Sequence, residues 1–192
     1  ELRHPEIADK AVVVGADPKG GNGRGVVSTA NYVARKFGIH SGMPISTAYR
    51  LKSDAVFLRV DDAYYEEMSK KVMAIVSAGA SKFEQVSIDE AFVDLSGIVS
   101  SYSDAVDYAK RIKDRISREL GLPCSIGISN SKIVAKMACE SAKPNGIKLV
   151  RPEDAKAFLA PLPVDKLYGV GKKTAEKLKQ LGFFRIHDIA NA

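Results

Sequence analysis

The stretch from residue 83 to residue 95 constrains the fold more than any other part of the sequence. Val86 and Ile88 fall on even positions, whereas Ala91, Val93 and Leu95 fall on odd positions. Because side chains alternate strictly between the two faces of a strand, a change of parity requires a turn or a bulge. The pattern therefore predicts a β-hairpin that turns at or near Asp89-Glu90.

Segments typical of strands and of helices alternate on both sides of this hairpin. Such an interleaved order favours an α+β fold in which helices cover one face of a ferredoxin-like sheet. After Arg151-Pro152 the pattern changes to short helices without strands, which indicates a small all-α domain. Strands are expected at residues 11–14, from residue 25, and at 55–60, 123–128 and 147–150. Helices are expected at residues 29–35 and 44–51, from residue 61, and at 106–120 and 131–141. Thr29 is expected to cap the first of these helices.

Charge and composition narrow the class of protein. The net charge of +6, supplied by 29 Lys and Arg residues, permits a polyanionic partner without proving one. No apolar run approaches the ~20 residues that cross a bilayer, and the first residues do not resemble a signal peptide. We therefore expect an intracellular, cytoplasmic protein with no membrane contact, in which Cys124 and Cys139 are buried free thiols.

The turn of the predicted hairpin carries two adjacent acids in Ser87-Ile88-Asp89-Glu90. On a straight strand neighbouring side chains point to opposite faces, but at a turn two carboxylates can converge. A few carboxylates together with substrate phosphates are the oxygen ligands that Mg²⁺ prefers. An exposed acidic turn without function explains the same residues, and the two interpretations are about equally supported by this segment.

Two further motifs could bind phosphate. Tyr32 and Arg35 are three residues apart, so that on a helix their hydroxyl and guanidinium groups lie on one side. In Lys143-Pro144-Asn145-Gly146 a tight turn would project the lysine as a point charge. A stacked surface pair and a simple surface turn are the alternatives, and each is favoured when its motif is considered alone.

The most specific local pattern runs from Tyr168 to Leu178 and places Gly169 and Gly171 before a helix that begins with Lys172 and Lys173. Glycines let the backbone approach a nucleic-acid phosphate, and the amides at a helix start can bind it. The pattern predicts a helix-hairpin-helix that binds the DNA backbone without reading its sequence. A plain helical hairpin is the alternative.

Taken together, the motifs resemble those of the Y-family DNA polymerases of the DinB, or DNA polymerase IV-like, branch. The resemblance is carried by Thr29–Arg35, Gly42-Met43-Pro44, Ser87–Ala91, Lys143–Gly146 and the hairpin at Gly169–Gly171, in the expected order over almost the whole chain. It implies an error-prone translesion polymerase that adds dNTPs to a primer 3′-hydroxyl by two-metal nucleotidyl transfer. The implied partners are primer-template DNA, dNTP and a sliding clamp.

The resemblance also implies a role for individual residues. Asp89 and Glu90 would be the catalytic carboxylates that hold two Mg²⁺ ions. The incoming nucleotide would be bound by Thr29, Tyr32, Arg35 and Lys143. The nascent base pair would lie against Val26, Ser28, Gly42 and Met43, and the DNA backbone against Gly169, Val170, Gly171, Lys172 and Lys173.

The same resemblance divides the chain into a palm (1–10 and 52–150), fingers (11–51) and a thumb (151–192). In this family a first palm strand carries another metal-binding aspartate and the aromatic side chain that excludes ribonucleotides. No residue here fits either role, and no segment matches the final little-finger domain, which would carry the clamp contact. We therefore expect a portion of a longer polymerase whose unpaired sheet edges make it poorly soluble or unstable by itself.

Two other functions fit part of the pattern. A nucleotidyl cyclase also uses carboxylate-held metal ions on a ferredoxin-like sheet, although it has no duplex for a thumb hairpin to hold. A non-catalytic helix-hairpin-helix module would bind duplex DNA with Asp89-Glu90 as a plain acidic turn. Cyclic product formed without DNA would identify the first, and DNA binding with no metal-dependent gain in nucleotide affinity would identify the second.

Overall fold

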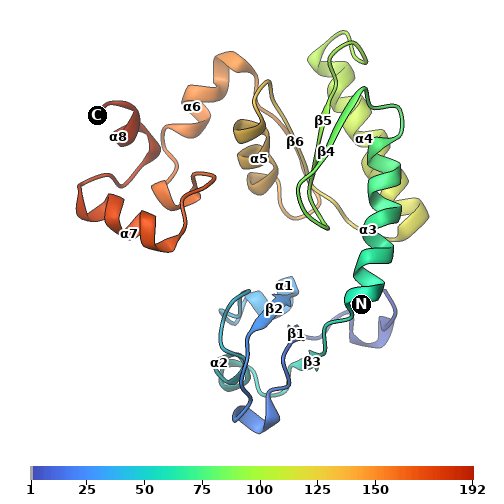
Figure 1. Cartoon of the computed structure of the whole chain (residues 1–192), viewed down its shortest axis with the longest axis vertical. Helices are drawn as coiled ribbons and strands as arrows, with labels where there is room; N and C mark the ends of the chain where they lie inside the picture. The colour runs from blue at the N-terminus through green and yellow to red at the C-terminus, as the bar shows by residue number, and fades with distance from the viewer. Residues whose placement is uncertain (1) are drawn as a thin grey trace. The chain divides into compact units, whose positions relative to one another are not determined.

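The computed structural model describes residues 2–192, and Figure 1 traces the chain from blue at the N-terminus to red at the C-terminus. The chain divides into two compact units, Glu1–Glu66 and Glu67–Ala192. The division falls within a long helix, α3 (Asp62–Ser77), which begins where the sequence predicts it, after Asp61.

The first unit is built around a three-stranded sheet in the order β2-β1-β3. The buried apolar run predicted from residue 11 forms the central strand, which pairs antiparallel with β2 and parallel with β3. Val13, Val27, Ile39 and Ile45 are almost completely buried and form the core. The elements of this unit are η1 (Pro5–Ile7), β1 (Val12–Gly15), η2 (Lys19–Gly21), β2 (Val27–Ala30), α1 (Tyr32–Arg35), α2 (Ile45–Leu51) and β3 (Val56–Leu58).

The start of helix α1 differs from the sequence prediction. Thr29 does not cap the helix, because it lies within β2 and pairs with Val14 of β1. The cap is Asn31, whose side-chain oxygen accepts a hydrogen bond of 2.9 Å from the amide of Ala34. The β-branched threonine suits the strand, while asparagine is among the residues preferred at a helix N-cap.

The second unit contains the predicted hairpin. Strands β4 (Lys82–Gln85) and β5 (Ala91–Asp94) pair antiparallel, with Gln85 opposite Ala91. The amides of Val86 and Ser87 both donate to the carbonyl of Glu90, at 2.9 and 3.2 Å, and close the turn. The parity change in the sequence is therefore confirmed as a turn at residues 86–90.

After the hairpin come α4 (Tyr102–Leu120), β6 (Ile126–Ile128), α5 (Lys132–Ser141) and β7 (Ile147–Leu149). The sequence predicts one palm sheet, but within residues 2–192 β4-β5 and β6-β7 are two separate hydrogen-bonded pairs. Side-chain packing connects them instead, because Ala105 and Ala109 of α4 share a core with Leu95 after β5 and with Ile126 and Ile128 of β6. The fold class is α+β, as predicted. The two strand pairs are joined by their packing against α4 and not by hydrogen bonds within one sheet.

Helix α5 packs closely on β6, and this contact depends on one glycine. A Cβ atom added at Gly127 would lie 1.9 Å from the carbonyl oxygen of Ala135 and 2.4 Å from the amide of Cys139. The helix backbone can therefore approach the strand only where no side chain intervenes. Val134, Met137 and Ala138 are buried on the inner face of the helix. Helix α5 is thus a rigid platform beside the hairpin.

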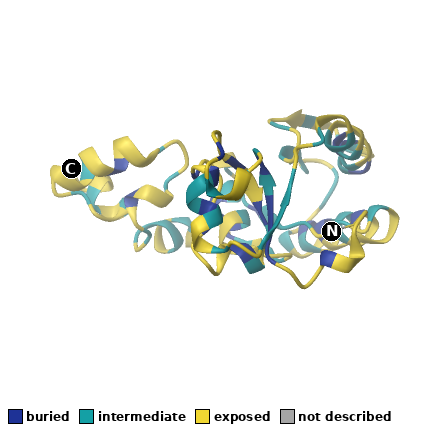
Figure 2. Cartoon of the chain, turned by 90° about the horizontal axis from the view of Figure 1, so that it is seen from below, coloured by how far each residue is buried: buried dark blue, intermediate teal, exposed yellow. Residues whose placement is uncertain are grey.

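The chain from residue 151 onward is helical, as the sequence predicts. Val164 is completely buried, and its amide donates to the carbonyl of Phe184 at 3.0 Å. In Figure 2 this segment is mostly yellow, the colour of exposed residues. Its elements are η3 (Pro152–Asp154), α6 (Ala155–Leu159), η4 (Val164–Lys166), α7 (Lys172–Gln180) and α8 (Ile186–Ala190).

The two compact units do not coincide with the predicted palm, fingers and thumb. The predicted fingers (11–51) share the first unit with 1–10 and 52–66, because β3 pairs with β1. The predicted thumb (151–192) shares the second unit with the rest of the predicted palm. The three-domain division stays a prediction. Cys124 and Cys139 are free thiols, half-buried rather than fully buried.

Candidate functional site

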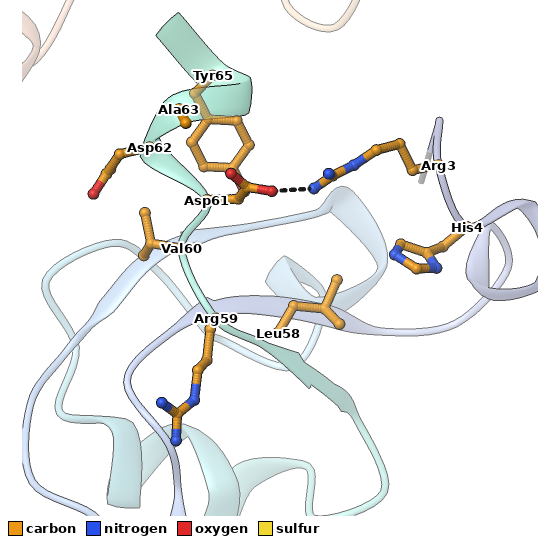
Figure 3. A pocket seen from close by; sticks show the side chains of 9 residues that line it. All are labelled: Arg3, His4, Leu58, Arg59, Val60, Asp61, Asp62, Ala63 and Tyr65. Carbon is orange, nitrogen blue, oxygen red and sulfur yellow. Dashed lines mark hydrogen bonds and ion pairs between the residues drawn. The ribbon is translucent and has the colours of Figure 1, made fainter.

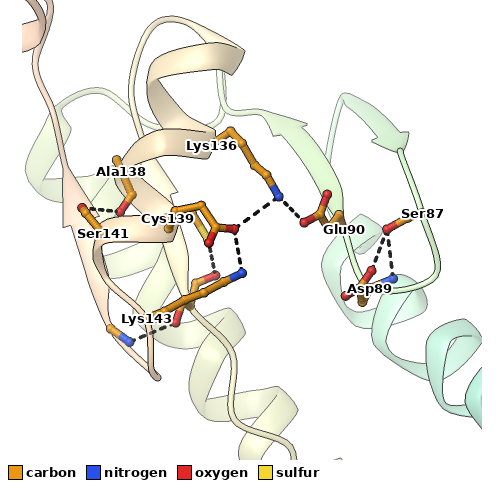
Figure 4. A network of polar contacts seen from close by, with 11 residues as sticks. Ser87, Asp89, Glu90, Lys136, Ala138, Cys139, Ser141 and Lys143 are labelled. Carbon is orange, nitrogen blue, oxygen red and sulfur yellow. Dashed lines mark hydrogen bonds and ion pairs between the residues drawn. The ribbon is translucent and has the colours of Figure 1, made fainter. Parts of the chain in front are cut away.

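The acidic turn presents Asp89 and Glu90 in two different environments (Figure 4). The hydroxyl of Ser87 donates a hydrogen bond of 2.7 Å to Oδ1 of Asp89. Asp89 is exposed, whereas Glu90 is half-buried and forms a hydrogen-bonded ion pair with Lys136 of α5. The turn therefore holds one acid through a neutral partner and the other through a cation.

The ion pair at Glu90 continues along α5 as a row of alternating charges. Lys136 also lies 3.5 Å from the carboxylate of Glu140, one helical turn further on. Lys143 in turn donates to Glu140 at 2.6 Å. The structure thus connects a predicted metal-binding acid, Glu90, to a predicted phosphate-binding lysine, Lys143, through Lys136 and Glu140.

The pKa values of the two linking residues follow from these contacts. Burial by itself lowers the pKa of Lys136, but the hydrogen bond and the charge of Glu90, followed by Glu140, raise it above its usual range. Burial raises the pKa of Glu140, but Lys143 and Lys136 together hold that pKa below its usual value. Both groups are therefore charged at neutral pH, as an ion-pair row requires.

The Lys143–Gly146 segment forms the predicted turn after α5. The peptide bond between Lys143 and Pro144 is cis, and Asn145 adopts a left-handed conformation with a φ of 56°. The side chain of Lys143 is exposed at the surface of the unit. Apart from its contact with Glu140, Lys143 is placed as the sequence predicts for a charge that can meet a phosphate.

The acidic turn offers ligands that suit a divalent cation, but it supplies only two carboxylates. Two adjacent carboxylates offer hard oxygen donors of the kind that Mg²⁺ prefers. Within residues 2–192 no group of three or more His, Cys, Asp or Glu side chains gathers in a way that could hold an ion. Asp89 and Glu90 would therefore have to share an ion with further oxygen ligands, such as those of a nucleotide phosphate.

Tyr32 and Arg35 are neighbours in the first unit, as their spacing predicts. The guanidinium carbon of Arg35 lies 5.4 Å from the ring centre of Tyr32. Nε of Arg35 donates to the carbonyl of Ala30 at 2.9 Å, which fixes the side chain against the end of β2. This is the stacked arrangement that the alternative interpretation describes.

The four residues predicted to meet the nascent base pair lie close together, at the beginning of β2 and in the segment before α2. Val27 donates to the carbonyl of Met43 at 2.9 Å and accepts from the amide of Gly42 at 2.8 Å. Val26 and Ser28, on either side of Val27, are exposed. Met43 is only 9% exposed and belongs to the core. Three of the four residues therefore lie at the surface, and Met43 supports them from beneath.

Ser28 lines a concavity of about 400 Å³ with residues that the sequence reasoning missed. Arg59 and Asp17 are two of them, and the guanidinium of Arg59 lies 3.6 Å from the carboxylate of Asp17. The other lining residues are Gly15, Ala16 and Val60. The only sequence signal for them is their position at the ends of β1 and β3, the strands that flank one another in the sheet.

A second pocket of the first unit, of about 500 Å³, contains none of the predicted site residues (Figure 3). Arg3 donates to the carboxylate of Asp61 at 2.8 Å and its guanidinium lies 4.0 Å from the ring centre of Tyr64. The hydrogen bond from Arg3, followed by one from the amide of Tyr64, lowers the pKa of Asp61. Because the amide of Tyr64 in the first turn of α3 donates to Asp61 at 3.2 Å, Asp61 fixes the beginning of this helix.

The predicted DNA-binding hairpin is also formed. Gly169 adopts a φ of 89°, which favours glycine, and the amide of Val170 donates to the carbonyl of Leu167 at 2.9 Å. Helix α7 follows, with Gly171 at its N-cap and no side chain of the described residues bonded to its first amides. Lys172 and Lys173 are exposed in the first turn. The first backbone amides of α7 and the side chains of Lys172 and Lys173 thus lie at the same end of the helix.

No helix among residues 2–192 is both long and apolar enough to cross a membrane.

Comparison with known proteins places these features in a family. The model of the impB/mucB/samB family matches residues 1–140, and the model of the IMS family HHH motif matches residues 152–183. The second match coincides with the helical segment that carries the hairpin at Gly169–Gly171.

Curated relatives are similar over nearly the whole chain. DNA polymerase IV 2 of Methanosarcina mazei is 50% identical over 97% of this chain and 51% of its own length. DNA polymerase IV of Methanoculleus marisnigri is 48% identical over 98% of this chain and 52% of its own length. The chain therefore spans about half the length of the curated relatives it matches.

Solved structures agree with the sequence comparison. The crystal structure of DinB from Sulfolobus solfataricus and an insertion ternary complex of Dbh DNA polymerase each superpose with a TM-score of 0.90 at 32% identity. Each match covers 100% of this chain and 56% of the other chain. The chain belongs to the impB/mucB/samB family and is a DinB-like member of the Y family.

Proposed function

We propose that the chain provides the catalytic core of an error-prone translesion DNA polymerase, which adds dNTPs to the 3′-hydroxyl of a primer paired to a template. Family membership supports this proposal, as do relatives named DNA polymerase IV. The observation that carries it is the hairpin turn at residues 86–90, which presents Asp89 and Glu90 at adjacent positions, with Glu90 paired to Lys136 of α5.

Asp89 and Glu90 are proposed to hold two Mg²⁺ ions together with the phosphates of the nucleotide. Bound at such a site, the two ions would stabilise the attacking and the leaving oxygen of an in-line displacement at the α-phosphorus. Asp89 is exposed and restrained through its Oδ1 by Ser87, so that it can accept an ion with little rearrangement. Glu90 is already oriented by Lys136.

The triphosphate is proposed to be bound by Thr29, Tyr32, Arg35 and Lys143. Arg35 is held at its Nε by the backbone of Ala30, which leaves the terminal guanidinium nitrogens to donate to phosphate oxygens. Lys143 extends from a tight turn and supplies a point charge. For this, Lys143 has to exchange its contact with Glu140 for one with phosphate.

The nascent base pair is proposed to lie against Val26, Ser28, Gly42 and Met43. Gly15, Ala16 and Ser28, which have small side chains and line the concavity, would leave space beside the base pair, which suits a polymerase that tolerates damaged templates. The hairpin at Gly169–Lys173 is proposed to hold the DNA backbone through amides and lysines, independent of sequence. A sliding clamp is proposed as a further partner of the complete enzyme.

Primer extension with Mg²⁺ tests this function. In the full-length protein Asp89→Ala and Glu90→Ala should each abolish extension while primer-template binding is largely retained. Incubation with nucleoside triphosphates in the absence of DNA should yield no cyclic product. Cyclic product would establish a cyclase instead, and duplex binding without any extension by the parent protein would establish a non-catalytic module.

A further inference from the structure

We propose that Lys136 is a positioning residue, which fixes the carboxylate of Glu90 in the orientation that catalysis requires. The inference rests on the proposed polymerase function and deepens it, because it concerns a residue that neither the motifs nor the resemblance assigns. It concerns only the second unit, in which both residues lie.

The first support is the rigidity of the element that carries Lys136. Helix α5 lies against β6 at Gly127, where there is no space for a Cβ atom. Ala138 is completely buried and Val134 is 7% exposed, so that the helix is also anchored through its inner face. The Cα atom of Lys136 is therefore held in place, and its side chain can define where a partner lies.

The second support is that Lys136 differs from the other lysine of the same helix that contacts the hairpin. Lys136 has an 18% exposed side chain and lies between two carboxylates, those of Glu90 and Glu140. Lys132, one turn earlier, pairs with Glu84 of β4, and both side chains are more than half exposed. Exposed ion pairs contribute little, whereas a partly buried lysine between two acids is strongly held.

The third support comes from Glu90 itself. Its carbonyl closes the hairpin turn by accepting from the amides of Val86 and Ser87, so that its backbone is fixed. The glutamate side chain nevertheless has three rotatable bonds, and the contact with Lys136 selects among their rotamers. Asp89 has a shorter side chain and is held by Ser87 instead. Each acid of the turn thus has a partner of its own that sets its direction.

Kinetic measurements on the full-length protein test the proposal. Replacing a partner that orients a metal-binding group typically costs about 10- to 100-fold. We expect Lys136→Met to lower kcat for primer extension by about that factor. The affinities for primer-template and for dNTP, measured by binding to a dideoxy-terminated primer, should stay at the parent values. Lys136→Arg, which keeps the donor and the charge, should recover most of kcat.

Lys132→Met is the matched control, since it removes a lysine and an ion pair from the same helix without touching Glu90. It should leave kcat unchanged. A second readout is independent of activity: in a double-mutant cycle, the shifts in melting temperature of Glu90→Gln and Lys136→Met should be non-additive, because the two residues share one contact. The shifts of Glu90→Gln and Lys132→Met should add.

Several results would overturn the inference. One is a kcat for Lys136→Met equal to that of Lys132→Met. Another is a loss of affinity for DNA or dNTP in Lys136→Met that accompanies its loss of kcat, because Lys136 would then be a substrate-binding residue. If Lys136→Met does not fold, Lys136→Arg decides, and a kcat about 10-fold or more below the parent value in a normally folded Arg variant contradicts the proposal. If Glu90→Gln itself extends primers normally, the proposed function fails; if Glu90→Gln is inactive and Lys136→Met is not, only the positioning role fails.

Discussion

Lys136 of α5 and Glu90 of the hairpin turn, 46 residues apart in the sequence, are joined by a hydrogen-bonded ion pair. Among residues 2–192 no hydrogen bonds between strands connect β5 to β6, so the hairpin depends on side-chain contacts for its position beside the rest of its unit. Two ion pairs join the hairpin to α5, this one and that between Lys132 and Glu84. The acidic turn therefore has a defined place on its unit.

The contact between α5 and β6 can be tested at Gly127. Gly127→Ala should destabilise the protein by at least about 1–3 kcal/mol, since the new Cβ atom would overlap the backbone of α5. Gly171→Ala is the control, because Gly171 has a φ of −78° and open space around it. Urea unfolding should show a lower midpoint for the first variant and an unchanged one for the second. Equal midpoints for the two variants would contradict this packing.

Asn31 should stabilise the first unit well beyond its role as a helix cap. Its side chain accepts from the amides of Val12 and Ala34, at 3.1 and 2.9 Å, and donates to the carbonyl of Lys10 at 2.9 Å. Asn31→Ala should therefore cost about 1–3 kcal/mol in unfolding free energy. Asn31→Asp keeps the accepting oxygen and should cost less. A loss below about 0.5 kcal/mol for the alanine variant would show that these bonds do not hold β1 to α1.

Lys172 and Lys173 should contribute to DNA affinity without sequence preference. Replacing both by alanine should weaken binding to all duplexes alike, and the slope of log K against log salt should fall by roughly 0.9 for each phosphate that the protein no longer neutralises. The control is Lys110→Ala, which removes a lysine of α4 that pairs with Asp107 at 3.0 Å. Fluorescence anisotropy over a salt series measures both. A change in sequence preference would refute the interpretation that these lysines bind only the DNA backbone.

The end of the chain should become less stable in acid because of Asp188. The amides of Arg185 and Phe184 donate to its carboxylate and lower its pKa from the usual value of 3.8. A lowered folded-state pKa stabilises the fold above pH 3.8, and the contribution is lost as the pH falls through the folded-state value. Hydrogen exchange of the α8 amides should therefore accelerate below pH 3.8 relative to intrinsic rates. In Asp188→Asn this added acid dependence should disappear, and an unchanged profile would contradict the assignment.

The sequence predicts the local elements well where the pattern has one explanation. The parity change near Ile88 can only be accommodated by a turn or a bulge, and the turn is there. The cap of α1 was misplaced because Thr29 is both an acceptable cap and a good strand residue, and pairing with β1 decides between them. That choice depends on a partner strand that local propensity does not contain.

The candidate site was predictable where a motif is contiguous, as in Ser87–Glu90 and Gly169–Lys173. Lys136 and Glu140 were missed because their contacts with Glu90 and with one another arise only when α5 is packed beside the hairpin. The residues around Ser28 were missed for the same reason, since Ala16 and Arg59 meet only when β1 and β3 pair. Met43, which the resemblance places against the nascent base pair, belongs to the core of its unit.

Single-turnover primer extension by Asp89→Asn, compared with Asp94→Asn, is the sharpest test of the proposed metal site. Asp94, on β5 of the same hairpin, bonds to the amide of Ser96 and is the matched control. We expect Asp89→Asn to extend primers at less than roughly one hundredth of the parent rate with primer-template affinity retained, while Asp94→Asn extends them normally. Normal extension by Asp89→Asn, or an equal loss in both variants, would contradict a catalytic role for the acidic turn.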